Sequence, residues 1–145
     1  MQVINRKAKF NYQLIEKFEA GMVLSGSEVK SIKEGHIDIS NAFAKIINGE
    51  LFLINANIPI ANGINYDPSR MRKLLMHKNE IISIEGKIKQ KKLTLVPTKV
   101  YTRGPLIKAE VALAKTKRKF EKKELIKKRD IKRDIERELR GKSLD

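Results

Sequence analysis

The pair Asn48-Gly49 constrains the fold more than any other feature of this sequence. It separates two apolar runs, residues 42–47 and 50–54. An Asn-Gly pair in this setting is typical of a two-residue hairpin turn of type I′, because both residues tolerate a positive φ. The sequence therefore predicts two antiparallel strands that meet at residues 48 and 49.

Alternating apolar residues predict further strands. Residues 93–103 form one, in which Pro97 removes a ladder donor and requires an edge position or a bulge. Gly104-Pro105 is expected to turn the chain into a strand over residues 106–114, with Ile107, Ala109, Val111 and Leu113 inward and Lys108 and Glu110 outward. An earlier strand is expected over residues 10–19, with one face shared by Phe10, Tyr12, Leu14, Glu16 and Phe18.

Two short helices complete the predicted elements. The first follows a cap at Ser25 or Ser27 and ends at Gly35, and the second covers residues 77–88. Residues 56–69 predict a loop, and residues 70–76 fit either a strand or a helical turn. Val29 and Ile32 are expected to face inward from the first helix, and Ile81, Ile84 and Ile88 recur at helical spacing in the second.

Five or six short strands with two short helices predict a mainly β protein. We expect an OB-like Greek-key antiparallel barrel, because closure protects strand edges in so short a chain. This barrel would occupy residues 1–114 as one domain, and residues 115–145 would form a separate basic tail.

The tail has too few apolar residues to form a core of its own. It holds 14 Lys and Arg against 7 Asp and Glu, so its net charge of +7 leaves +8 of the whole chain's +15 for residues 1–114. Ile131, Ile135 and Leu139 make one thin line along a helix. We expect this segment to become helical only against a polyanion, which neutralises its charge.

The composition limits the classes of partner. A net charge of +15 and an isoelectric point of about 10.1 favour nucleic acid or an anionic membrane face as the partner. No cysteine is present, so disulfides and thiolate metal sites are excluded. No apolar run approaches the ~18 residues that a membrane span needs, and the first residues lack the apolar segment of a signal peptide. We expect a cytoplasmic monomer with no membrane, metal, cofactor or small-molecule substrate.

Basic clusters are the strongest candidates for a binding site. One opens the chain at Asn5-Arg6-Lys7, and a second joins Arg70, Arg72 and Lys73 beside Tyr66. Lys87, Lys89, Lys91 and Lys92 make a third. Their cations would meet phosphates, and aromatic rings would stack on unpaired bases. Catalysis has weaker support, since His36 and Asp38 as a base and its orienting partner, with Ser25, Ser27 or Ser31 as nucleophile, rest on spacing alone. We therefore expect no enzyme activity.

An ordered set of motifs along nearly the whole chain resembles the small protein B (SmpB) family, the SsrA-binding proteins of bacterial trans-translation. Each motif is weak alone, and the order and spacing of the set make it specific. The motifs are Asn5-Arg6-Lys7-Ala8, Glu16-x-x-Glu19-Ala20-Gly21, Gly26-Ser27-Glu28-Val29-Lys30-Ser31, Gly49-Glu50-Leu51-Phe52-Leu53, Pro68-x-Arg70-x-Arg72-Lys73-Leu74-Leu75, Thr94-Leu95-Val96-Pro97 and Val111-Ala112-Leu113-Ala114-Lys115.

The resemblance implies a protein that binds the tRNA-like domain of transfer-messenger RNA (SsrA RNA) and delivers it to stalled ribosomes. The tail would enter the empty mRNA channel near the decoding centre of 16S rRNA. The body residues implied or expected at the RNA are Asn5, Arg6, Lys7, Glu19, Glu28, Lys30, Arg70, Arg72 and Lys73. The tail residues expected at the ribosome are Lys115, Lys117, Arg118, Phe120, Lys122, Lys123, Lys127, Lys128 and Arg129.

Some positions depart from the family pattern. Phe120 lacks the polar group of the usual His or Tyr, and Lys123 replaces an Arg and loses its planar fork. Thr116 and Lys92 stand where Gly is common in the family. Two main alternatives to the rescue role stay open: a generic ribosomal or OB-type RNA-binding protein, and an RNA-processing enzyme that uses His36 and Asp38. A membrane-surface role for the tail has the least support, because Phe120 is its only aromatic residue and its apolar line is thin.

Overall fold

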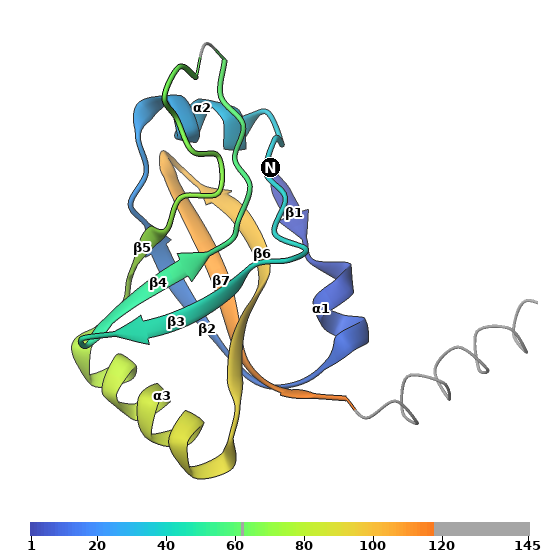
Figure 1. Cartoon of the computed structure of the whole chain (residues 1–145), viewed down its shortest axis with the longest axis vertical. Coiled ribbons are helices and arrows are strands. Elements are labelled where there is room, and N and C mark those ends of the chain that lie inside the picture. Colours follow the sequence, from blue (N-terminus) through green and yellow to red (C-terminus); the bar gives the residue numbers. More distant parts are fainter. Residues whose placement is uncertain (62, 118–145) are drawn as a thin grey trace, which may run out of the picture.

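The computed structural model describes residues 1–61 and 63–117, and these form seven strands and three helices (Figure 1). All of the strand pairings among these residues are antiparallel. In chain order the elements are β1 (Gln2–Ile4), α1 (Arg6–Asn11), β2 (Tyr12–Met22), α2 (Gly26–Lys33), β3 (Phe43–Ile47), β4 (Glu50–Ile54), β5 (Arg72–Leu75), α3 (Lys78–Lys91), β6 (Thr94–Arg103) and β7 (Leu106–Thr116).

Six of these strands close into a ring. Each of β3, β4, β5, β2, β7 and β6 pairs with its neighbours in this order, and β6 pairs back to β3, while β1 adds to the free side of β6. The closing contact is thin, because β3 and β6 share the single Cα pair Ala44 and Leu95. The prediction of a mainly antiparallel β protein with short helices is therefore confirmed, with the ring nearly closed.

The predicted hairpin is confirmed. Asn48 has φ of 52° and Gly49 has φ of 77°, so both residues lie in the left-handed region that a type I′ turn requires. Ile47 and Glu50 pair directly across the turn. The turn thereby fixes the register of β3 and β4, which sets Leu51 and Leu53 toward the core.

The predicted first helix is also confirmed, as α2. The Ser25 side chain accepts a hydrogen bond from the backbone N–H of Glu28, and the Glu28 side chain accepts one from the backbone N–H of Ser25. This reciprocal capping box satisfies two N–H groups that a helix start leaves unpaired. Ile32 is fully buried, and Gly35 follows the helix with a positive φ.

The remaining predicted elements lie close to their expected places. Residues 70–76, which were ambiguous, contain strand β5, and residues 77–88 lie largely within α3. The register of β6 and β7 shifts between Pro97 and Lys99, which is a bulge of the kind that Pro97 predicted. The four predicted inward residues of β7 are all buried: Ile107, Ala109, Val111 and Leu113.

The prediction for residues 10–19 is wrong in two respects. Phe10 belongs to helix α1, whose start is capped by the side chain of Asn5. Leu14 and Phe18 do not share a face, because a bulge between Leu14 and Glu16 changes the alternation. Leu14 packs outside the ring against the cluster of Ala8, Val96 and Ala114, whereas Phe18 packs against the main core.

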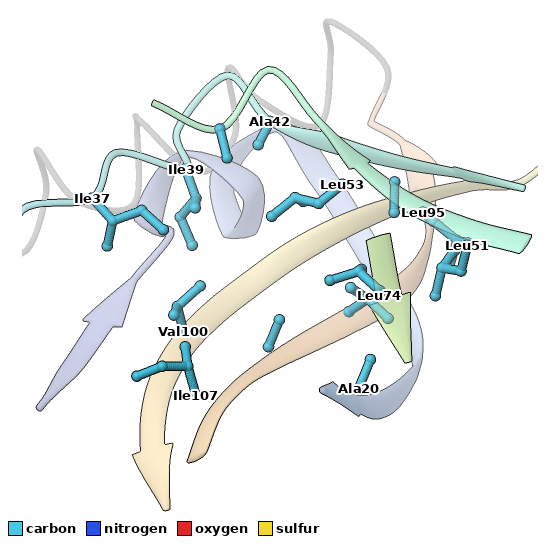
Figure 2. Close-up of a cluster of buried hydrophobic side chains, with 14 of the residues drawn as sticks. Ala20, Ile37, Ile39, Ala42, Leu51, Leu53, Leu74, Leu95, Val100 and Ile107 are labelled. Carbon is cyan, nitrogen blue, oxygen red and sulfur yellow. The ribbon is translucent and has the colours of Figure 1, made fainter. Parts of the chain in front are cut away.

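The main core fills the inside of the ring. Figure 2 shows side chains from opposite strands meeting there, together with Ile37 and Ile39 from the segment that links α2 to β3. Helix α1 covers part of the outer surface instead, over Val96 and Ala114. Figure 1 shows α2 and the long loop that joins β4 to β5 at one end of the ring and α3 at the other.

Two glycine substitutions test the backbone argument with opposite signs. Gly49→Ala places a Cβ on a left-handed residue, and we expect it to lower the free energy of unfolding by about 1 kcal/mol. Gly86→Ala adds a Cβ inside α3, where it meets nothing within 4 Å, and we expect it to raise the free energy of unfolding by roughly 0.5 kcal/mol. Urea denaturation of both variants measures the difference, and equal stability of the two would contradict the assigned turn.

Candidate nucleic-acid interface

A buried ion pair joins α2 to β5. The side chains of Glu28 and Arg72 are both 0% exposed. One carboxylate oxygen of Glu28, Oε2, accepts hydrogen bonds from Arg72 Nε at 2.9 Å and from Arg72 Nη2 at 2.7 Å. Arg70 donates a hydrogen bond to the other carboxylate oxygen, Oε1. This single carboxylate therefore binds two arginines, Arg72 at the start of β5 and Arg70 two residues before it.

The same pair fixes the long loop over residues 56–69. The hydroxyl of Tyr66 lies 2.9 Å from Glu28 Oε2 and 2.8 Å from the carbonyl of Ile58, and it accepts a hydrogen bond from Arg72 Nη2 at 2.8 Å. Arg72 Nη1 donates to the carbonyl of Ala56 at 2.6 Å. Among the described residues, no buried side-chain nitrogen or oxygen lacks a partner. The loop is therefore tied to α2 and β5 at three points.

Glu28 stays ionised in this cluster. Burial by itself raises the pKa of a carboxyl, but the hydrogen bonds from Arg70, the Ser25 backbone, Arg72 and Tyr66 outweigh it and hold the pKa of Glu28 at about 2. The charge is thus retained at neutral pH, where both arginines need it.

Asn5 also serves the fold with its side chain. It is 3% exposed, and its amide donates to the carbonyls of Ile39 at 2.9 Å and Pro97 at 2.8 Å. Its side-chain oxygen accepts from the N–H of Ala8 and caps α1. Asn5, Glu28 and Arg72 are therefore buried, although the sequence analysis predicted all three among the RNA-binding residues.

The other predicted body residues are accessible but fall into separate groups. Arg6 and Lys7 lie on α1, where Lys7 donates to Asn41 at 2.7 Å. Lys30 lies on α2 and lines a hollow of about 520 Å³ with His36 and Ile60. Lys73 pairs with Glu50 at 3.2 Å. Arg70 is part of the Glu28 cluster, and its side chain is 38% exposed.

Glu19 lies on a different surface, the outer face of β2, β7 and β6. The strand register sets Glu19 beside Glu110, which pairs in turn with Lys99, and sets Lys108 beside Tyr101. A shallow hollow of about 600 Å³ opens over these strands. We call this surface the Glu19 platform, and it comprises Lys17, Glu19, Lys99, Tyr101, Arg103, Lys108 and Glu110.

Contacts within the Glu19 platform orient its aromatic ring. Tyr101 donates its hydroxyl proton to Glu19, and Arg103 Nη1 lies 3.1 Å and 3.2 Å from the two Glu19 oxygens. The Lys99 ammonium lies 5.3 Å from the centroid of the Tyr101 ring, which is a cation–π distance. Four cations face two carboxylates here, so the platform is net positive.

The platform's protonation states follow from the same contacts. The hydrogen bond from Tyr101 lowers the pKa of Glu19, and the charges of Arg103 and Lys108 lower it further. Burial and the hydrogen bond to Glu19 raise the pKa of Tyr101 to about 12. At neutral pH the phenol therefore stays a hydrogen-bond donor beside an ionised carboxylate.

Sequence reasoning missed most of this platform. It named Glu19 but assigned no role to Lys17, Lys99, Tyr101 or Arg103. The alternation of side chains along the predicted strand 93–103 could have indicated these residues. Val100 is buried, so residues 99, 101 and 103 lie on the outer face.

The alternative catalytic residues do not form a dyad. Asp38 accepts hydrogen bonds from the Ser40 hydroxyl at 2.7 Å and the Ser40 N–H at 2.9 Å, and these lower its pKa. His36 Nδ1 lies 3.6 Å from Glu34 instead. Within residues 1–61 and 63–117, no group of three or more His, Asp or Glu side chains could hold a metal ion. None of the helices described there is long and apolar enough to cross a bilayer.

Of the predicted tail residues, Lys115 and Lys117 belong to the described part. Lys115 is in β7, which runs to Thr116, and the N–H of Lys117 donates to the carbonyl of Asn11 at 3.0 Å. The Lys117 ammonium donates to the carbonyl of Lys9. The others lie outside the described residues: Arg118, Phe120, Lys122, Lys123, Lys127, Lys128 and Arg129.

A small basic ring of antiparallel strands that presents cations and an oriented tyrosine on one face has the character of a nucleic-acid-binding protein.

Comparisons with known proteins identify the family. The family model described as SmpB protein matches residues 2–141. The SsrA-binding protein of Persephonella marina is 49% identical over 141 residues, covering 95% of this chain and 93% of that protein. The SsrA-binding protein of Thermosipho melanesiensis is 49% identical over 142 residues, covering 94% and 96%. A chain of the solved structure "tmRNA-SmpB: a journey to the center of the bacterial ribosome" is 40% identical with a TM-score of 0.69, covering 86% of this chain and 94% of that one. The chain belongs to the SmpB family.

Replacing Glu28 tests the buried cluster. Glu28→Gln leaves two arginines without a counter-charge, and we expect it to lower the free energy of unfolding at neutral pH by about 3 kcal/mol. Because the pKa of Glu28 is depressed in the folded state, its contribution is present above about pH 4.5 and is lost as the pH falls toward 2. Denaturation measured between these pH values should therefore show that the free energy of unfolding falls more steeply with decreasing pH in the wild type than in Glu28→Gln.

The exposed pair of Glu50 and Lys73 supplies a control, since Glu50→Gln removes the same charge at a screened site. Equal effects of the two substitutions would contradict the role assigned to Glu28.

Proposed function

We propose that this protein binds the tRNA-like domain of transfer-messenger RNA and delivers it to stalled ribosomes for trans-translation. The observation that carries this proposal is the Glu19 platform, found in a chain that is 49% identical to SsrA-binding proteins. The protein acts by binding and positioning RNA and performs no chemistry on it. Its partners are transfer-messenger RNA and the ribosome.

We further assign the ring of strands to the OB-like Greek-key barrels. In this assignment residues 1–114 are the RNA-binding body and residues 115–145 are a basic tail, which begins with the last two residues of β7 and becomes helical beyond them in the ribosome. Strand closure supports the first part, since it removes sheet edges that would otherwise pair with other chains. The net charge of +7 on residues 115–145 supports the second.

The body would grip RNA through the Glu19 platform and the cations of α1 and α2. Lys99 and Arg103 can neutralise phosphates, and the Tyr101 hydroxyl and the Glu19 carboxylate offer a donor and an acceptor to 2′-hydroxyls or base edges. Arg6 and Lys7 extend the positive charge at α1, and Lys30 extends it at α2. Such recognition depends on shape and phosphates more than on base sequence.

The enclosed residues of the motif set would act through their neighbours. Asn5 caps α1 and thereby orients Arg6 and Lys7. Glu28 and Arg72 fix α2, which carries Lys30, and leave Arg70 half exposed at the edge of the cluster. In this proposal they are positioning residues, and their replacement would weaken RNA binding by disordering the cations around them.

The tail would read the empty mRNA path near the decoding centre. Its predicted contacts from Arg118 to Arg129 stay predictions from the sequence. A generic RNA-binding protein without a rescue role is the second candidate, and the basic platform by itself is compatible with it. The two differ in what the tail does.

Removing residues 118–145 separates these candidates. The truncated chain keeps all of β7 and the platform, so we expect its affinity for transfer-messenger RNA to fall less than about tenfold, through lost charge alone. Tagging of stalled peptides in a purified translation system should be abolished. If tagging survives, the rescue role of the tail is wrong; a parallel loss of both activities would favour the generic RNA-binding protein.

Replacing single lysines tests the platform. Lys99→Ala should lower the affinity for the isolated tRNA-like domain severalfold and reduce the slope of log affinity against log salt by about 1, because one phosphate contact is lost. Lys78→Ala at the exposed start of α3 removes the same charge away from the platform and serves as its control. Filter binding over a range of salt concentrations gives both quantities. Identical losses in the two variants would show that only the overall charge matters.

A further inference from the structure

The strand β3 has an unpaired backbone edge. Its two-residue turn makes Ile47 and Glu50 a hydrogen-bonded pair with β4, and such pairs alternate along an antiparallel ladder. Lys45 is therefore also hydrogen-bonded to β4. Ile46, between Lys45 and Ile47, directs its N–H and C=O to the opposite edge of β3.

The neighbouring strand β6 occupies that opposite edge at one place. Ala44 pairs there with Leu95, and the ladder goes no further among the described residues. The backbone groups of Ile46 therefore have no strand of the described chain beside them. A strand edge of this kind can bind the backbone of a further extended chain.

The unpaired edge borders an apolar groove between β3 and α3, which encloses about 430 Å³. We call this hollow the β3–α3 groove. Apolar side chains make up most of its lining: Phe43, Ala44, Ile46, Ile88, Leu93 and Leu95. The groove thus combines a backbone donor and acceptor with a surface that favours apolar side chains.

The side chains of β3 define which extended chain would fit. Ala44 is buried and Ile46 packs against the core, so these two point to the inner face. Phe43 and Lys45 are exposed on the outer face. Residues opposite each other on neighbouring strands share a face. An added strand would therefore alternate apolar side chains, directed inward beside Ile46, with side chains directed outward beside Lys45.

The charges around the groove favour acidic side chains at those outward positions. Lys45 and Lys89 line the groove, and Lys91 and Lys92 follow at the end of α3. Glu85 is the one carboxylate among the described residues of the lining, and it is paired with Lys89 at 3.4 Å. The rim is therefore positive, and an acidic chain complements it.

The same charges argue against other occupants. The tail carries a net charge of +7 and a second copy of this chain carries +15, so the lysine rim repels both. A polynucleotide would be attracted to the lysines, but it lacks the peptide backbone that continues a strand ladder. The edge and the rim together favour an acidic segment of another protein.

We propose that the β3–α3 groove binds an extended segment of another protein, in which acidic residues alternate with apolar ones, by adding it to β3 as a strand. Thr94 lines the groove, and Tyr101 of the Glu19 platform lies seven residues further along β6, which is roughly 20 Å. The segment and an RNA on the platform therefore bind at the same time. This inference does not depend on the proposed function, because it needs only the edge, the lining and the rim.

Peptide binding tests the charge of the occupant. A fluorescent peptide that alternates Glu with Val is titrated with the full-length chain, and its anisotropy is measured. Lys45→Glu should weaken binding about fivefold, because an attraction becomes a repulsion. Lys78→Glu makes the same charge change at the exposed start of α3 and should leave binding nearly unchanged. Equal losses in the two variants, or tighter binding of a peptide that alternates Lys with Val, overturn the proposal.

Hydrogen exchange of single amides, followed by NMR, tests strand addition. The saturating Glu–Val peptide should slow exchange of the Ile46 N–H more than about tenfold, because this donor gains an acceptor. The Lys45 N–H, which already bonds to β4, should change far less and serves as the internal control. Unchanged exchange at Ile46 while the peptide is bound overturns the proposal. Displacement of the peptide by a single-stranded RNA of mixed sequence also overturns it, since nucleic acid would then occupy the groove.

Discussion

The ion pair of Glu28 with Arg72 is the interaction on which the arrangement of this protein depends. It joins α2, β5 and the loop over residues 56–69 at one end of the ring, and each polar atom in it has a partner. Removal of one side would leave a buried charge, which is costly, so the three segments keep one relative position. The ion pair therefore also positions Lys30 and Arg70, the cations at that end of the ring.

The ring of strands then fixes the position of the Glu19 platform. Along β6, bulged at Pro97, the outer face carries the platform toward one end, and the contact with β3 narrows to a single Cα pair toward the other. A protein that recognises RNA by its shape and phosphates needs its cations at fixed separations. A nearly closed ring provides this, because its strands cannot slide without breaking the core.

The sequence anticipated a good part of the fold and less of the interface. The hairpin at Asn48 and Gly49, the cap at Ser25 and the bulge at Pro97 were all predictable, because turn and cap chemistry is local. Helix α1 and the bulge before Glu16 were missed, since a six-residue helix and an extra strand residue are stabilised by packing over Ala8 and Ala114. Glu28 was named as an RNA contact, and its burial beside Arg72 depends on residues over 40 positions apart.

What the sequence by itself determined is therefore the class: a small, basic, mainly β protein with a charged extension, whose ordered motifs match the SmpB family. Only the tertiary structure decided which motif residues are exposed and which are enclosed. It also brought Glu19, Tyr101 and Arg103 into contact from strands far apart in the chain. The physical reason is that charge and turn chemistry are properties of neighbouring residues, whereas burial and side-chain pairing arise when distant strands close into one ring.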